Sequence, residues 1–139
     1  MTESAASSDP VLAANRRLVI DHFEDFVNRR DLGAVDRNLT TDFLDHDGPG
    51  GKPAGRAAEK ALMSGLHDLF PDLHVEVKDC IAQDDKVVVR NLWTGTNART
   101  GQRMEFHGFV LWRIADGNIA ERWATVTPLN EITQQALDW

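Results

Sequence analysis

The sequence predicts an α+β fold, in which helices pack on one face of an antiparallel sheet. Up to about residue 70, apolar residues recur at the three- and four-residue spacing of helices. After Pro71 the apolar period changes to two, which is typical of half-buried strands. Because 139 residues is the length of one domain, we expect a disordered lead-in over residues 1–10 and a single domain over residues 11–139.

Three helices are expected in the first half of the chain. Asp9 and Pro10 indicate a helix start, with an acidic N-cap and proline at the first helical position, and the apolar spacing continues to about Arg29. Asp31 begins a short second helix. The third covers residues 54–70 and follows a segment rich in glycine and proline that excludes regular structure.

Four strands connected as an antiparallel meander are expected in the second half. They cover residues 73–78, 86–96, 102–114 and 118–127, and a short terminal helix is expected over residues 129–137. The third strand is apolar on both faces, with Val110 and Trp112 on one and Phe109 and Leu111 on the other. A sheet covered by helices on one side is normally polar on the other, so this pattern predicts a homodimer through the outer face.

Composition excludes several classes of function. The net charge of −7 argues against a partner made of nucleic acid and against anionic membranes, and no apolar run is long enough for a membrane helix. The start of the chain lacks the pattern of a secretory signal, and the single cysteine, Cys80, fits a reducing, cytoplasmic setting. The five histidines show no metal-ligand spacing, so no metal is expected.

Three segments together resemble one known family. DFLDHDGPGGKPAG, LFPDLHVEVKDCIAQDDKVVVRNLWTGT and MEFHGFVLWRIADGNIAERW are similar to the SnoaL-like polyketide cyclases of the nuclear-transport-factor-2-like superfamily, over roughly residues 42–127. The resemblance implies a cone-shaped barrel, with N-terminal helices packed in a strongly curved antiparallel sheet and a deep pocket at the open end. It also implies dimers through the outer sheet face.

The implied function is cofactor-independent acid/base chemistry on a hydrophobic carbonyl substrate, of the polyketide or terpenoid type. The superfamily hosts many activities, so two alternatives stay open. One is a non-catalytic module that binds a small molecule in the same pocket. The other is a SnoaL-like hydroxylase.

Three polar residues are candidates for the chemistry. Asp45 matches a position that is usually polar in related enzymes and is a candidate general base; alternatively, it stabilises a turn. His46 is a candidate proton relay, or else it holds the glycine-rich loop by a hydrogen bond. Arg90 interrupts a run of valines and is a candidate cation for a substrate oxyanion, or the partner of Glu105 or Asp45 in a structural ion pair.

Side chains on the predicted pocket wall are candidates for substrate binding. They are Phe43, Leu92, Thr94, His107, Trp112 and Trp123. Leu92 and Thr94 share the parity of Arg90 on their strand, whereas strict alternation turns His107 outward unless a bulge precedes Gly108. The tryptophans are expected in the core, where one or two would also form an apolar wall for a flat ligand.

The last strand departs from the family pattern. Cyclases and epoxide hydrolases of this type carry a catalytic acid there, but the matching positions hold Ala124 and Thr127. Neither side chain exchanges a proton near neutral pH. The departure predicts that acid/base work has moved to Asp45 and His46, and it also favours the binding module over ring closure.

Overall fold

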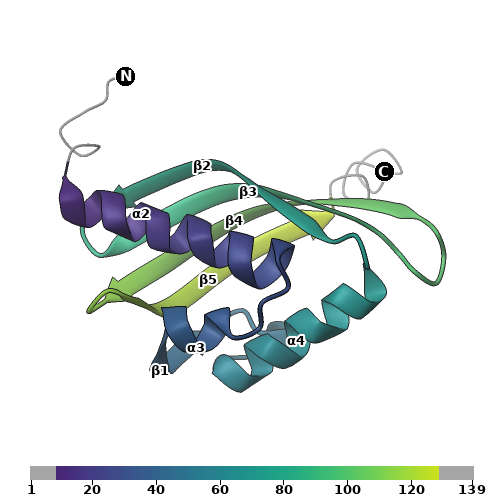
Figure 1. The fold of residues 1–139 in the computed structure, drawn as a ribbon, viewed down its shortest axis with the longest axis horizontal. Coiled ribbons are helices and arrows are strands. Elements are labelled where there is room, and N and C mark those ends of the chain that lie inside the picture. The colour runs from purple at the N-terminus through teal and green to yellow at the C-terminus, as the bar shows by residue number, and fades with distance from the viewer. Residues whose placement is uncertain (1–8, 129–139) are drawn as a thin grey trace, which may run out of the picture.

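The computed structural model describes residues 9–128, so the expected lead-in and terminal helix lie almost wholly outside the described residues. Its helices are α2 (Pro10–Phe23), which continues into the π-helical turn η1 (Glu24–Asn28), then α3 (Ala34–Asn38), the short 3-10 turn η2 (Pro49–Gly51) and α4 (Arg56–Leu69). Its strands are β1 (Leu39–Asp45), β2 (His74–Gln83), β3 (Lys86–Thr96), β4 (Arg103–Ala115) and β5 (Asn118–Pro128). The predicted α+β class is confirmed (Figure 1).

The sheet differs from the prediction in one strand. Its order is β1-β5-β4-β3-β2, and β1 pairs with β5 in parallel, so the sheet is mixed rather than wholly antiparallel. The predicted meander is confirmed as β2 to β5, but no strand had been predicted over β1. The sheet is curved and open rather than closed into a barrel, with β1 and β2 as its two edges.

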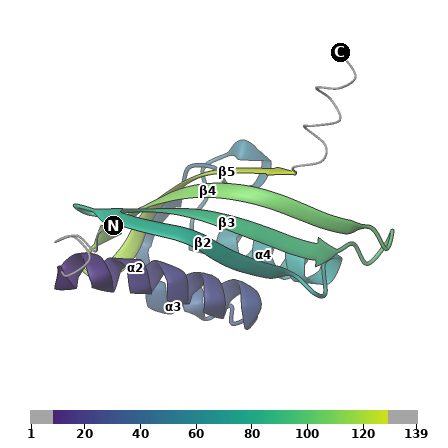
Figure 2. The ribbon, with the colours of Figure 1, turned by 90° about the horizontal axis from the view of Figure 1, so that it is seen from above.

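The helices lie on the concave side of the sheet (Figure 2). The side chain of Asp9 caps α2 by accepting from the amides of Val11 and Leu12, as its position before Pro10 predicts. Apolar side chains from α2, such as the fully buried Val19, pack against inward residues of the strands. The helices and the sheet together enclose the core, and the space between them holds the cavity described below.

The inward face of β3 is the opposite of the one we predicted. Val87, Val89 and Asn91 are buried at no more than 1% exposure, whereas Arg90 points outward. Strand β4 follows the prediction, with Val110 and Trp112 buried and Phe109 on the outer face, where it is 58% exposed. The pairing of β3 with β4 is continuous, so alternation fixes these directions along both strands.

Candidate functional site

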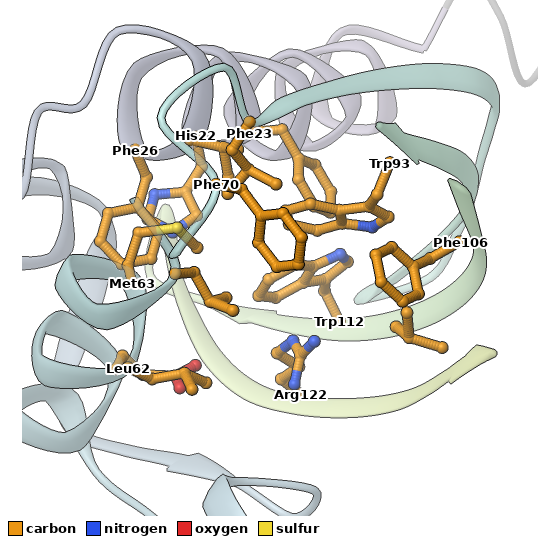
Figure 3. A pocket seen from close by; sticks show the side chains of 15 residues that line it. His22, Phe23, Phe26, Leu62, Met63, Phe70, Trp93, Phe106, Trp112 and Arg122 are labelled. Atoms are coloured by element: carbon orange, nitrogen blue, oxygen red, sulfur yellow. The ribbon is translucent and has the colours of Figure 1, made fainter. Parts of the chain in front are cut away.

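A cavity of about 260 Å³ lies between α2, α4 and the concave face of the sheet (Figure 3). Most of its wall is apolar, and six aromatic side chains line it: Phe23, Phe26, Phe70, Trp93, Phe106 and Trp112. Among the described residues that line it, three carry strongly polar groups, namely His22, Glu59 and Arg122. An apolar cavity with a few convergent polar groups is the usual form of a small-molecule site.

Asp45 and Arg122 form a buried ion pair beside this cavity. They are register partners on the parallel strands β1 and β5, and Nη1 of Arg122 lies 2.8 Å from Oδ2 and 3.0 Å from Oδ1 of Asp45. Asp45 is fully buried, and its Oδ1 also accepts from the amide of Asp47 at 2.9 Å. The carboxylate of Asp45 thus stabilises its turn, which was one of the two roles expected for it. It also holds the guanidinium of Arg122, which lines the cavity.

Glu59 places a second carboxyl group next to Asp45. It lies in the first turn of α4, is 8% exposed and lines the cavity. Burial first, then a hydrogen bond with Asp45 and the charge of Asp45, together raise the pKa of Glu59 to about 8, against the opposing charge of Arg122. Near neutral pH, Glu59 is therefore mostly protonated and shares its proton with a neighbouring carboxylate.

His22 brings an imidazole to the same cavity from α2. It is 3% exposed, stacks on Phe26 with ring centroids 5.1 Å apart, and meets the edge of Trp112 at 6.1 Å. Burial first, and then the positive charges of Arg122 and Arg37, together lower the pKa of His22 to about 4. The ring is therefore neutral at physiological pH.

The predicted proton relay, His46, lies on the other face of the sheet. Its ring is parallel to that of Trp123 at a centroid distance of 4.6 Å, and its Nε2 lies 2.7 Å from Oε2 of Glu121. Glu121 also pairs with Arg113, and these two hydrogen bonds, that of His46 first, lower the pKa of its carboxyl group. Asp45 and His46 are adjacent in sequence but lie on opposite sides of the sheet, so the structure separates the predicted base from its predicted relay.

Four other predicted residues also lie outside the cavity wall. Arg90 pairs with Asp79 at 2.7 Å on the outer face, so it forms a structural ion pair, with a partner other than the two we considered. Leu92 and Thr94 share its parity, and His107 is the register partner of Leu92, with no bulge at Gly108 to turn it inward.

The remaining predicted residues lie in three different places. Trp112 lines the cavity as expected, whereas Phe43 is buried in the core at 3% exposure and Trp123 belongs to the outer cluster with His46. At the position of the missing acid, the amide of Ala124 donates to Asp47 at 2.8 Å. The burial of Thr127 lies outside what the structure describes.

Sequence reasoning missed Glu59, Arg122 and His22. Glu59 had a usable signal, because Glu59, Met63 and His67 recur every four residues and form the buried stripe of α4.

Among residues 9–128, no group of three or more potential ligands could hold a metal ion. Within the same range, no helix is long and apolar enough to cross a membrane.

A curved, open sheet with helices on its concave side defines a cone fold of the α+β class. The chain belongs to the SnoaL-like polyketide cyclase family, whose model matches residues 17–134. The resemblance that the sequence carried is thereby confirmed. No curated protein matches the chain by sequence.

Solved structures share this fold. AclR from Streptomyces galilaeus, a proposed hydroxylase, is 26% identical with a TM-score of 0.76, over 88% of this chain and 85% of its own. IdmH from Streptomyces antibioticus, a proposed polyketide cyclase, is 23% identical with a TM-score of 0.74, over 86% and 98%. A proposed SnoaL-like polyketide cyclase from Jannaschia sp. CCS1 is 21% identical with a TM-score of 0.78, over 90% and 93%.

Proposed function

We propose that this protein is a cofactor-independent enzyme that performs acid/base chemistry on a hydrophobic carbonyl substrate of the polyketide or terpenoid type. The observation that carries the proposal is the buried carboxyl of Glu59 in the wall of an apolar cavity, next to the Asp45–Arg122 ion pair. A carboxyl pair that holds one proton can accept or deliver a proton near neutral pH, which is what such chemistry requires. Family membership and the aromatic wall support the substrate class.

In the proposed step, Glu59 passes its proton to Asp45, and the freed carboxylate of Glu59 removes a proton from the carbon next to the substrate carbonyl. The C–H electron pair forms the enolate, whose negative oxygen is stabilised by Arg122. The proton then returns to carbon in an isomerisation. In a ring closure, the enolate carbon instead attacks a second carbonyl and the new alkoxide takes the proton, so no oxidant or reductant is needed.

The proposal moves two roles that the sequence had given to other residues. Arg122 takes the oxyanion role expected of Arg90, because its guanidinium points into the cavity while Arg90 pairs with Asp79 on the outer face. Glu59 takes the proton-transfer role expected of His46. Asp45 keeps a part in the acid/base pair, as the carboxylate that shares the proton of Glu59.

The test is enzyme-catalysed exchange of the carbon-bound protons of β-tetralone, a small fused-ring ketone, in deuterium oxide, followed by NMR. The wild-type protein should exceed the buffer rate, and Glu59→Gln and Arg122→Gln should each lower the excess by at least about a hundredfold. The matched control is Arg90→Gln, which should leave the rate unchanged. Equal rates for the wild type and Glu59→Gln would refute the proposal.

A hydroxylase or a binding module is the alternative. The similarity to AclR favours the first, and the absence of an acid at Ala124 favours the second. Ketone binding without exchange would support the binding module.

The single cysteine, Cys80, supports a cytoplasmic setting.

We also propose a homodimer through the outer face of the sheet. Phe109 and Ile81 project from this face at 58% and 63% exposure, and Arg90 and Asp79 place opposite charges beside them. A twofold dimer buries the same patch from both copies, so a face with balanced charges can meet itself without net repulsion.

A further inference from the structure

Resting on the proposed function, we infer that the cavity has a separate subsite in which Trp93 and Phe106 pack against an aromatic ring of the substrate. This subsite lies at the opposite end of the cavity from Glu59 and Arg122. Asn91, a buried neighbour of Trp93, acts as a positioning residue that fixes the orientation of the indole. A fused-ring ketone thus binds with its carbonyl at one end and its aromatic ring at the other.

The strand register places the two ends of the cavity far apart. Trp93 and Phe106 are register partners on β3 and β4, whereas Arg122 is the register partner of Trp112, six residues further along β4. At about 3.3 Å per residue, this separates the backbones by roughly 20 Å along the strand. All four side chains line the cavity. The cavity therefore runs along the strands, from Arg122 to the two aromatic rings.

An aromatic wall connects the two ends. Phe23 of α2 meets the ring of Trp93 edge to face with centroids 6.2 Å apart, and it meets Trp112 in the same way at 5.5 Å. Figure 3 shows Trp93 and Phe106 on one side of the cavity and Met63 of α4 on the other. A flat ligand can lie along this wall, because aromatic rings pack well in edge-to-face and offset arrangements.

The orientation of Trp93 is fixed by a buried hydrogen bond. Its Nε1 donates to Oδ1 of Asn91 at 3.0 Å, and Asn91 is 1% exposed on the same face of β3. The register partner of Asn91 is Gly108, where a Cβ would collide with that oxygen. The amide thus has its place only because β4 carries no side chain there. The indole is oriented before a ligand binds, which lowers the entropic cost of binding.

Phe106 is supported in a similar way. Its ring meets that of Phe70 edge to face at a centroid distance of 6.2 Å. Phe70 is 6% exposed, and it packs so closely on Gly95 of β3 that a Cβ there would lie 3.0 Å from it. A rigid aromatic surface of this kind favours a flat aromatic ring over a puckered saturated ring, because aromatic pairs gain more than their buried area alone provides.

The test compares the binding of β-tetralone with that of trans-2-decalone, a two-ring ketone whose second ring is saturated, by isothermal titration calorimetry. A cavity of about 150 Å³ takes one benzene ring, so about 260 Å³ leaves room for the second ring of either ketone. Burial alone favours trans-2-decalone, because its saturated ring has more apolar surface. With the subsite, the wild type should bind β-tetralone at least about threefold more tightly than trans-2-decalone.

Trp93→Leu and Phe106→Leu should each lower this preference by roughly twofold to tenfold, the contribution of one aromatic pair. The matched control is Phe26→Leu, the same kind of substitution at the opposite end of the cavity, which should change both Kd values alike. An unchanged preference in both Trp93→Leu and Phe106→Leu would overturn the inference. So would a wild-type preference for trans-2-decalone.

Asn91→Leu tests the positioning role. It removes the acceptor of the Trp93 indole, so it should lower the preference for β-tetralone while leaving the Kd of trans-2-decalone nearly unchanged. A purely structural role predicts a different result, in which both ketones bind more weakly by the same factor. That result would refute the role given to Asn91.

A second readout uses the wild type alone, so it does not depend on whether a variant folds. Val126 lines the cavity next to Gly108, and Met63 lines it one helical turn after Glu59. Intermolecular nuclear Overhauser effects should connect the aromatic protons of bound β-tetralone to the methyl groups of Val126. They should connect the methylene protons beside the carbonyl to the methyl group of Met63. The reverse pattern would overturn the inference.

Failure of the proposed function is distinguishable from failure of the subsite. If the preference for β-tetralone behaves as expected but deuterium exchange is absent, the subsite stands without the chemistry. If exchange occurs but Trp93→Leu and Phe106→Leu keep the preference, the subsite alone is refuted.

Discussion

Nη1 of Arg122 lies within 3.0 Å of both carboxylate oxygens of Asp45, so one buried ion pair joins the edge strand β1 to its neighbour β5. Asp45 is fully buried, and the side chain of Arg122 is only 16% exposed. The pair therefore supports the fold and also orients a guanidinium toward the cavity. Its removal should affect stability and chemistry together.

Asp45→Asn should lower the free energy of unfolding by about 3 kcal/mol, because it leaves a buried guanidinium without its counter-charge. Urea denaturation at neutral pH measures the change. The control is Asp79→Asn, which breaks the exposed ion pair with Arg90 and should cost less than about 1 kcal/mol. Equal effects of the two variants would show that burial does not strengthen the inner pair.

Glu59 should make the protein less stable as the pH rises from about 5 to 8. Its pKa is about 8 in the folded state against an ordinary value of 4.5, so the unfolded chain releases this proton first. The folded state binds more protons across that interval, and stability falls with rising pH. Glu59→Gln mimics the protonated form and should remove this component.

Urea denaturation of wild type and Glu59→Gln at several pH values between about 5 and 8 checks this expectation. Both proteins carry the same other titrating groups, so comparing them cancels the contributions of those groups to the free energy of unfolding. The difference in stability should shift in favour of the variant as the pH rises. Parallel curves would mean that Glu59 ionises in the folded state as it does in the unfolded chain.

The long elements were predictable from sequence because local pattern and tertiary environment agree in them. β3 has the predicted bounds, since an uninterrupted run rich in β-branched residues ends in turns on both sides. Strand β1 was missed because its seven residues pair with β5, about 80 residues further along the chain, and local periodicity carries no information on such a partner.

The site was harder to predict because it depends on which side of β3 faces inward and on which side of α4 is buried. Val88 and Val89 are equally apolar, and Arg90 and Asn91 are both polar, so alternation alone did not decide which side of β3 faces inward. The structure buries Asn91, whose Oδ1 accepts from Trp93. A charged residue on an amphipathic helix is usually solvent-exposed, so the four-residue spacing of Glu59 with Met63 and His67 was passed over, and its contact with Asp45 is not a local pattern.

Phe109→Lys should convert the proposed dimer to a monomer without unfolding it. Phe109 is 58% exposed on the outer face, so lysine there meets no steric conflict within one chain but places like charges at the centre of a twofold interface. Sedimentation velocity over a range of concentrations measures the change. Val11→Lys in α2 is the control, since Val11 is 64% exposed but lies away from that face. A monomeric wild type would rule out the dimer.

Gly108→Ala should lower the free energy of unfolding by about 2 kcal/mol, because β4 has no room for a side chain there. A Cβ at Gly108 would lie 2.2 Å from Oδ1 of Asn91, which is 1% exposed and accepts from Trp93. Asn91 must therefore move, which strains the packing and breaks that hydrogen bond.

Gly65→Ala is the matched control for this variant. Gly65 lies in the middle of α4, and an added Cβ would meet nothing within 4 Å. The same change there should raise the free energy of unfolding by roughly 0.5–1 kcal/mol, because alanine restricts the unfolded chain and favours the helix. Urea denaturation of both variants should thus give opposite signs. A neutral Gly108→Ala would mean that the amide of Asn91 is free to leave the position in which it holds Trp93.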